Sequence, residues 1–176
     1  MNTEYIFLWV LSFLHRKKCF VMKAQAIIFK YVIMTMGGYL VVRTFVYGTL
    51  KQHQPNFPII KSGIFCGVGK LEKSSRYRMV SLGAFPALIP ASSKDSQIIN
   101  GEIWKVDDNA FLNVELLEGY PTFYDREKLI VKDSKGNDHH CFVYYIPDEL
   151  SSRQLRSVHM GTWLGKEDSL YGVVNG

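Results

Sequence analysis

Short runs of apolar and β-branched residues, separated by glycine and other turn-forming residues, recur from residue 41 to residue 146. Residues of these types favour pleated, half-buried strands. Helices do not alternate regularly with these runs, which argues against a doubly wound parallel sheet. The sequence therefore predicts an α+β domain around a small, partly closed sheet or barrel. The predicted strands cover residues 41–46, 63–72, 77–82, 85–89, 103–106, 124–131 and 140–146.

Glycine and asparagine mark the expected bends and turns. Gly67 and Gly69 fall inside one of the predicted strands, so they indicate a bend or bulge there. The dipeptide Asn100-Gly101 is a strong hairpin signal and predicts a turn between two apolar runs. A second hairpin is expected around the turn at residues 135–137.

One segment has clear helical spacing. Asp107 or Asp108 can cap its start, Gly119 supplies its stop, and Pro121 lies just beyond. Residues 148–157 carry a weaker helical pattern. The apolar positions that recur along the clear helix are Ala110, Phe111, Val114 and Leu117.

The charge distribution argues against nucleic acid as a partner, and the cysteine content indicates the redox compartment. The net charge is +5, but residues 1–36 hold five basic and one acidic side chain, which leaves only +1 for the remainder. Because that remainder shows no basic stripe with interleaved aromatic residues, nucleic acid is not an expected partner. Three cysteines at no recognisable spacing argue against a disulfide framework and favour a reducing, cytoplasmic location.

Residues 1–36 are expected to form an extension ahead of a single domain at 37–176. The extension contains a ten-residue apolar block at 5–14, followed by a basic cluster at 15–18. A secretory signal has the opposite order, and a bilayer span needs about 20 apolar residues. Two interpretations stay open. The segment is either a poorly packed extension, which we favour, or an interfacial membrane anchor.

The loop after the first predicted strand is the first candidate binding element. A strand that breaks at a glycine can turn backbone N–H groups toward a ligand, although the same pattern also describes a simple turn. The loop lacks the second glycine and the Lys-Ser/Thr pair of a phosphate-binding P-loop. Its residues are Tyr47, Gly48, Thr49 and Leu50.

Glu118 is the candidate acid/base. It ends the predicted helix, where the helix dipole disfavours a carboxylate, and Leu117, Tyr120 and Pro121 are expected to crowd it with apolar surface. Both effects favour the protonated form and predict a raised pKa, useful for proton transfer near neutral pH. A solvated glutamate that tolerates its position is the alternative.

Other polar residues have plainer interpretations. Tyr124 and Arg126 are two positions apart on a predicted strand, so they share a face, and a cross-strand pairing role is the default for both. The run 139–141 combines two histidines and a cysteine, but adjacent strand residues point to opposite faces. A surface histidine pair beside a turn is therefore expected, and no metal or other cofactor.

Four segments together resemble the gamma-glutamylcyclotransferase-like family, and within it the gamma-glutamylaminecyclotransferase branch. The resemblance covers roughly residues 40–146, and four motifs in the right order make chance improbable. Glu115 departs from it, since many relatives have aspartate there. The matching segments are 45–56, 85–89, 101–104 and 118–126, the last with Glu118, Pro121, Tyr124 and Arg126 at the family's spacing.

The resemblance implies a small mixed-sheet β-barrel with flanking helices, and a lyase that expels 5-oxoproline from a gamma-glutamyl amide. It implies that Glu118 is the catalytic acid/base, that Tyr47, Gly48, Thr49 and Leu50 bind the glutamyl group, and that Tyr124 lines the pocket. The expected partner is a small gamma-glutamyl compound such as gamma-glutamyl-ε-lysine. Two alternatives stay open, namely a cyclotransferase for gamma-glutamyl amino acids and a non-catalytic ligand-binding domain.

Overall fold

The computed structural model describes residues 41–147 and 157–165. Contacts divide the chain into two units at Tyr39/Leu40, and all of the described residues belong to the second unit. The predicted extension 1–36 and residues 148–156 of the predicted helical segment lie outside the described residues. The domain boundary near residue 36 therefore stays a prediction.

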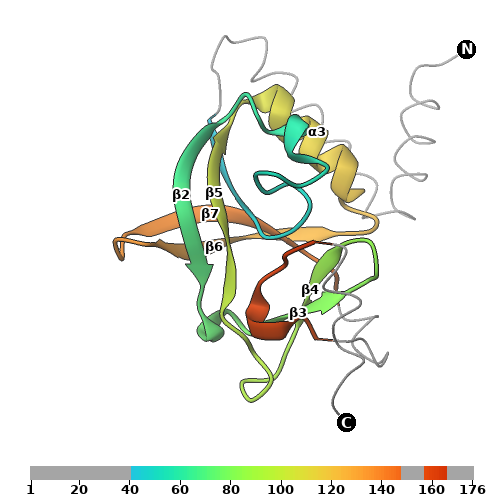
Figure 1. Ribbon diagram of the computed structural model, residues 1–176, viewed down its shortest axis with the longest axis vertical. Coiled ribbons are helices and arrows are strands. Elements are labelled where there is room, and N and C mark those ends of the chain that lie inside the picture. Colours follow the sequence, from blue (N-terminus) through green and yellow to red (C-terminus); the bar gives the residue numbers. More distant parts are fainter. Residues whose placement is uncertain (1–40, 148–156, 166–176) are drawn as a thin grey trace, which may run out of the picture. The chain divides into compact units, whose positions relative to one another are not determined.

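Five strands form a closed barrel in the order β1-β5-β2-β6-β7 (Figure 1). β1 pairs with β5 antiparallel along its whole length and with β7 parallel at Thr44 and Phe142. That parallel contact closes the barrel and makes it mixed, so the predicted small mixed-sheet barrel is confirmed. The strands are β1 (Val42–Val46), β2 (Ile64–Leu71), β5 (Ile99–Val106), β6 (Asp125–Asp133) and β7 (Asp138–Tyr145).

A separate two-stranded sheet, β3 (Tyr77–Ser81) and β4 (Pro86–Pro90), forms a hairpin beside the barrel (Figure 1). Its turn closes through a hydrogen bond from the Leu82 N–H to the Phe85 carbonyl. Gly83 has a φ of 89°, a conformation that glycine adopts without strain. The described 3₁₀ turns are η1 (Phe57–Ile59), η2 (Lys73–Ser75) and η4 (His159–Gly161).

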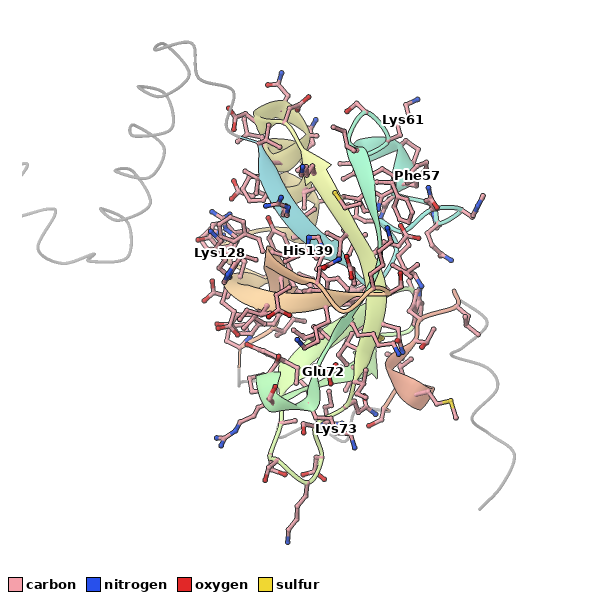
Figure 2. All side chains as sticks on the ribbon, turned by 90° about the vertical axis from the view of Figure 1, so that its left-hand side faces the viewer. Phe57, Lys61, Glu72, Lys73, Lys128 and His139 are labelled. Carbon is pink, nitrogen blue, oxygen red and sulfur yellow. The ribbon has the colours of Figure 1, made fainter. Side chains whose placement is uncertain are left out.

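The predicted bulge and the predicted hairpin at residues 135–137 are both present. Pairing of β2 with β5 shifts register between Phe65 and Gly67, where Gly67 has a φ of 130°. β6 and β7 pair antiparallel around a turn that the Asp133 carboxylate stabilises by accepting the Lys135 and Asn137 N–H groups. Figure 2 shows His139 on this hairpin.

The predicted hairpin at Asn100-Gly101 is wrong. Both residues lie inside the continuous strand β5, where Asn100 pairs with Lys70 and Gly101 pairs with Gly69. Glycine is needed there for close approach, because a Cβ atom on Gly101 would lie 2.5 Å from the Val46 carbonyl oxygen. The glycine that suggested a turn is therefore explained by the lack of space for a side chain inside the barrel.

The predicted helix is confirmed as α3 (Asp108–Glu118). The Asp107 side chain accepts the Ala110 N–H at 2.8 Å and caps the start of the helix. At the other end, Gly119 adopts a left-handed conformation with a φ of 61° and ends the helix. Glu118 is thereby held at the last helical position of α3.

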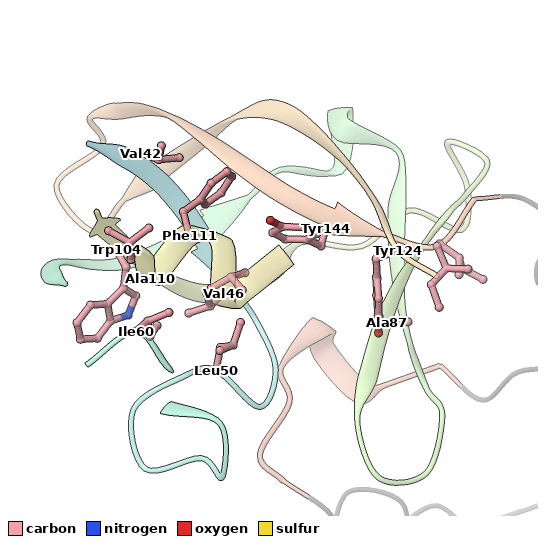
Figure 3. Close-up of a cluster of buried hydrophobic side chains, with 14 of the residues drawn as sticks. Val42, Val46, Leu50, Ile60, Ala87, Trp104, Ala110, Phe111, Tyr124 and Tyr144 are labelled. Atoms are coloured by element: carbon pink, nitrogen blue, oxygen red, sulfur yellow. The ribbon is translucent and has the colours of Figure 1, made fainter. Parts of the chain in front are cut away.

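Side chains on β1 alternate between two apolar clusters, as expected for a strand with both faces buried. Val42 and Val46 join a cluster that includes Ala110, Phe111 and Val114 of α3, which packs the helix against the barrel. Phe45 and Tyr47 join a second cluster with the inward residues of the other strands. Figure 3 shows the first cluster, which also contains Leu50, Tyr124 and Tyr144.

Candidate active site

The loop that follows β1 is shaped by a close approach to β4. A Cβ atom on Gly48 would lie 2.8 Å from the Pro86 side chain, so glycine is required for space at this position. Asn56 closes the loop, since its N–H donates to the Thr49 carbonyl at 2.9 Å and its side-chain amide donates to Thr49 Oγ1 at 3.0 Å. The N–H groups of Gly48, Thr49 and Leu50 donate to none of the described residues. Because the three residues line the cavity described below, these N–H groups are candidates for binding a ligand.

Glu118 has the raised pKa that its position predicts. Burial of the carboxyl group raises its pKa from 4.5 to about 7. Leu117 lines the cavity beside Glu118. Burial, the effect expected from apolar crowding, is the cause of the shift, and the contribution of the helix dipole stays a prediction.

A cavity of about 310 Å³ brings the predicted site residues together. This volume lies at the lower end of the range of about 300–1,000 Å³ typical of small-molecule sites. Tyr47, Gly48, Thr49, Leu50, Glu118 and Tyr124 all line it. The other lining residues are Phe45, Val46, Pro55, Asn56, Ala84, Phe85, Pro86, Leu117, Phe123 and Tyr144.

Three tyrosines form much of the polar lining. Tyr47 donates its hydroxyl proton to the Tyr144 carbonyl at 2.8 Å, and Tyr124 donates to the Pro86 carbonyl at 3.0 Å. Burial, reinforced by the nearby Glu118 charge, raises the pKa of both hydroxyls, so they remain protonated at neutral pH. Both tyrosines are therefore fixed, neutral parts of the wall.

Tyr144 is a site residue that sequence reasoning missed. Its hydroxyl oxygen is buried, and among the described residues it has no hydrogen-bond partner. Other atoms of Tyr144 line the cavity. No motif in the sequence distinguishes it from the neighbouring Tyr145, whose ring lies 5.3 Å from that of Tyr77 instead.

Arg126 does not line the cavity. Its expected cross-strand role is present, because it pairs with Tyr144 of β7 and its guanidinium lies over the Phe142 ring, and it also reaches α3. Its guanidinium contacts Glu115 of α3 at 2.9 Å. The guanidinium carbon also lies 4.5–4.8 Å from the ring centres of Phe111, Tyr120 and Phe142. Arg126 therefore ties β6 to the last turns of α3, the helix that ends at Glu118.

The histidine and cysteine side chains of β7 hold no metal cluster. His139 lies 3.0 Å from the Asp133 carboxylate, His140 is exposed, and Cys141 is buried. Within residues 41–147 and 157–165, no three metal-binding side chains gather at one place. The same ranges contain no helix long and apolar enough to cross a membrane.

The site has the parts needed to move a proton within a partly open cavity. A carboxyl group with a pKa near 7 can both accept and release a proton at neutral pH. Backbone N–H groups in the same cavity can bind a carboxylate or a developing oxyanion.

Comparison with known protein sequences gives consistent matches. A family model described as "Gamma-glutamyl cyclotransferase, AIG2-like" matches residues 44–165. A putative gamma-glutamylcyclotransferase of Drosophila melanogaster is 30% identical over 130 residues, which cover 66% of this chain and 78% of the fly protein. A gamma-glutamylaminecyclotransferase of Rattus norvegicus is 30% identical over 122 residues, covering 60% of this chain and 81% of the rat protein.

Solved structures share the same architecture. The crystal structure of an AIG2-like protein from Mus musculus matches with a TM-score of 0.52 and 29% identity, covering 60% of this chain and 76% of the mouse chain. An uncharacterised protein from Pyrococcus horikoshii matches with a TM-score of 0.52 and covers 69% of this chain and 88% of its own. At 21% identity, the second match shows the fold alone.

Proposed function

The chain belongs to the gamma-glutamyl cyclotransferase, AIG2-like family, and from this premise we propose that it cyclises gamma-glutamyl amines, such as gamma-glutamyl-ε-lysine. The products are 5-oxoproline and a free amine. The observation that carries the proposal is the buried Glu118 carboxyl, with a pKa of about 7, in the same cavity as the loop of residues 47–50.

The reaction needs no nucleophile from the protein. The α-amine of the glutamyl group attacks its own γ-carbonyl carbon, a C–N bond forms to close a five-membered ring, and the original amide C–N bond breaks. The attacking amine is mostly an ammonium ion at neutral pH and must first lose a proton. Between the ammonium ion and the ring N–H the α-nitrogen loses two protons, and the departing nitrogen gains two and leaves as an ammonium ion. Glu118 accepts each proton in turn and donates it to the departing nitrogen, so protons and electrons balance without a redox partner.

The loop and the tyrosines serve as positioning groups. The N–H groups of Gly48, Thr49 and Leu50 bind the glutamyl carboxylate or the developing oxyanion and hold a ring-closing conformer. Tyr124 supplies a rigid wall, because its hydroxyl is already committed to the Pro86 carbonyl. Tyr144 contributes a further part of the cavity wall.

The amine class of substrate is supported by the relatives and by the sequence motifs. The rat relative is named a gamma-glutamylaminecyclotransferase, whereas the fly relative carries the broader name. A cyclotransferase for gamma-glutamyl amino acids and a non-catalytic binding domain are the two competing functions. A reducing, cytoplasmic setting is also proposed, supported by the free thiols of Cys66 and Cys141.

The test is 5-oxoproline release by the wild type and by Glu118→Gln. We expect the wild type to release it from gamma-glutamyl-ε-lysine and the variant to lose at least 1,000-fold in kcat while keeping its fold by circular dichroism, because glutamine cannot accept the proton. Glu72→Gln, at the end of β2 (Figure 2), is the matched control and should keep full activity. Wild-type turnover by Glu118→Gln would refute the catalytic role. Substrate binding without product from the wild type would favour the binding domain.

A further inference from the structure

Part of the cavity lining is apolar and open to solvent. Leu117 is 40% exposed and Phe123 is 49% exposed, although both line the cavity together with Ala84 and Phe85. These four residues, here called the apolar rim, come from α3, the segment before β6 and the turn between β3 and β4. Large apolar side chains left exposed at the edge of a cavity commonly mark a surface that a ligand covers.

The rim is also supported by aromatic packing. The Phe123 ring meets the Phe85 ring edge to face, with centres 6.4 Å apart and planes at 75°. It meets the Tyr124 ring at 5.1 Å and 79°. Neighbours on both sides hold Phe123 in place, so its exposed surface is a preformed contact for a flat or extended apolar group.

The lining offers little to a charged leaving group. Of the sixteen residues that line the cavity in the described part of the chain, Glu118 alone has a carboxyl group, and none is lysine, arginine or histidine. A second charge brought against the rim would lose water without gaining an ionic partner, which is costly. An apolar group would instead gain by leaving water, at about 25 cal/mol per Å² of surface buried.

We infer that the apolar rim is the leaving-group subsite, and that the preferred substrates are gamma-glutamyl amides of apolar amines, with an aromatic or extended alkyl group packed on Leu117, Phe85 and Phe123. The inference rests on the proposed function, in which the departing nitrogen lies next to Glu118. Leu117 lines the same cavity as Glu118, so a group attached to that nitrogen can reach the rim. We expect a higher kcat/KM for such amides than for gamma-glutamyl-ε-lysine, whose leaving amine carries two charges at its far end.

Two matched pairs of substrates test the inference on the full-length wild type. Gamma-glutamyl-phenethylamide and gamma-glutamyl-ethylamide differ only by a phenyl ring. Gamma-glutamyl-pentylamide and gamma-glutamyl-ε-lysine share a five-carbon chain and differ by the charged groups at its end. We expect kcat/KM for 5-oxoproline release to be at least tenfold higher for the first member of each pair. Equal values within the pairs, or a preference for the second members, would overturn the inference.

Variants test whether the rim is the cause of the preference. Leu117→Ser and Phe123→Ser should each reduce the phenethyl-to-ethyl ratio at least threefold, with turnover of the ethylamide less affected. Leu116→Ser is the matched control, because Leu116 is 78% exposed on the same helix and does not line the cavity. Its ratio should stay at the wild-type value. An unchanged ratio in both rim variants would show that the rim does not cause the preference for apolar amines, and would refute its assignment as the leaving-group subsite.

Failure of this inference is distinguishable from failure of the proposed function. If the wild type releases 5-oxoproline from all four amides at similar rates, the proposed function stands and the apolar subsite is wrong. If it releases none from any of them while remaining folded, the proposed function itself fails.

Discussion

At the scale of single residues, the raised pKa of the Glu118 carboxyl group makes the stability of the protein depend on pH. Its pKa is about 7 in the folded protein and about 4.5 once burial is removed. Between these values the folded state holds a proton that the unfolded state has lost, so the free energy of unfolding falls as pH rises through this window. Above pH 7 the ionised, partly buried carboxylate lowers the free energy of unfolding.

Glu118→Gln should therefore stabilise the protein at pH 8. The full pKa shift corresponds to about 3 kcal/mol, and the partial exposure of Glu118 reduces the expected gain to about 1–2 kcal/mol. The gain should vanish at pH 4.5, where the wild-type carboxyl is protonated in the folded state. Guanidinium unfolding of both proteins at the two pH values measures the difference. A gain of the same size at both would show that ionisation of Glu118 is not its cause.

At the scale of secondary-structure elements, Arg126 is expected to fix the position of α3 relative to β6. Arg126→Met keeps much of the apolar contact with Phe111, Tyr120 and Phe142 but removes the cation that Glu115 contacts at 2.9 Å. Removing one partner of a largely buried ion pair is costly, so the free energy of unfolding should fall by about 2–4 kcal/mol. Because α3 ends at Glu118, kcat should also fall, by roughly tenfold.

The matched control for Arg126→Met is Lys128→Met, two positions along the same strand and exposed. It should change stability by less than about 0.5 kcal/mol. Stability comes from denaturant unfolding and kcat from 5-oxoproline release. Loss of stability with an unchanged kcat would mean that Arg126 supports the fold without positioning Glu118.

Elements with local signals were predictable, and elements that depend on distant contacts were not. The cap at Asp107 and the stop at Gly119 fix α3 within a few residues, so the sequence sufficed for the helix. Asn100-Gly101 carries a turn signal, but its pairing with β2 overrides that signal. The loop of residues 47–50 and Glu118 could be proposed from motifs. Tyr144 could not, because only the barrel register brings it to the cavity.

At the scale of the whole molecule, the site depends on closure of the barrel. β1 lies between β5 and β7, and its pairing with β7 joins residues 98 positions apart in the chain. The loop that follows β1 can face Glu118 only once both ladders have formed. The family match begins at residue 44, and β1 begins at Val42. The residues that line the cavity all come after residue 44.

A chain that begins at Met36 should therefore fold and react like the full-length protein. Its unfolding midpoint in guanidinium is expected within about 0.2 M of the full-length value, since no described core residue is removed. kcat/KM for gamma-glutamyl-ε-lysine should stay within about twofold. The matched comparison is a chain that begins at Thr44, which loses Val42 from the core and Arg43 from the ladder with β5. That chain should be less stable by about 2 kcal/mol or more. If the chain that begins at Met36 is inactive while the full-length protein is active, the first 35 residues contribute to the catalytic domain. That result would refute the domain boundary predicted from the sequence.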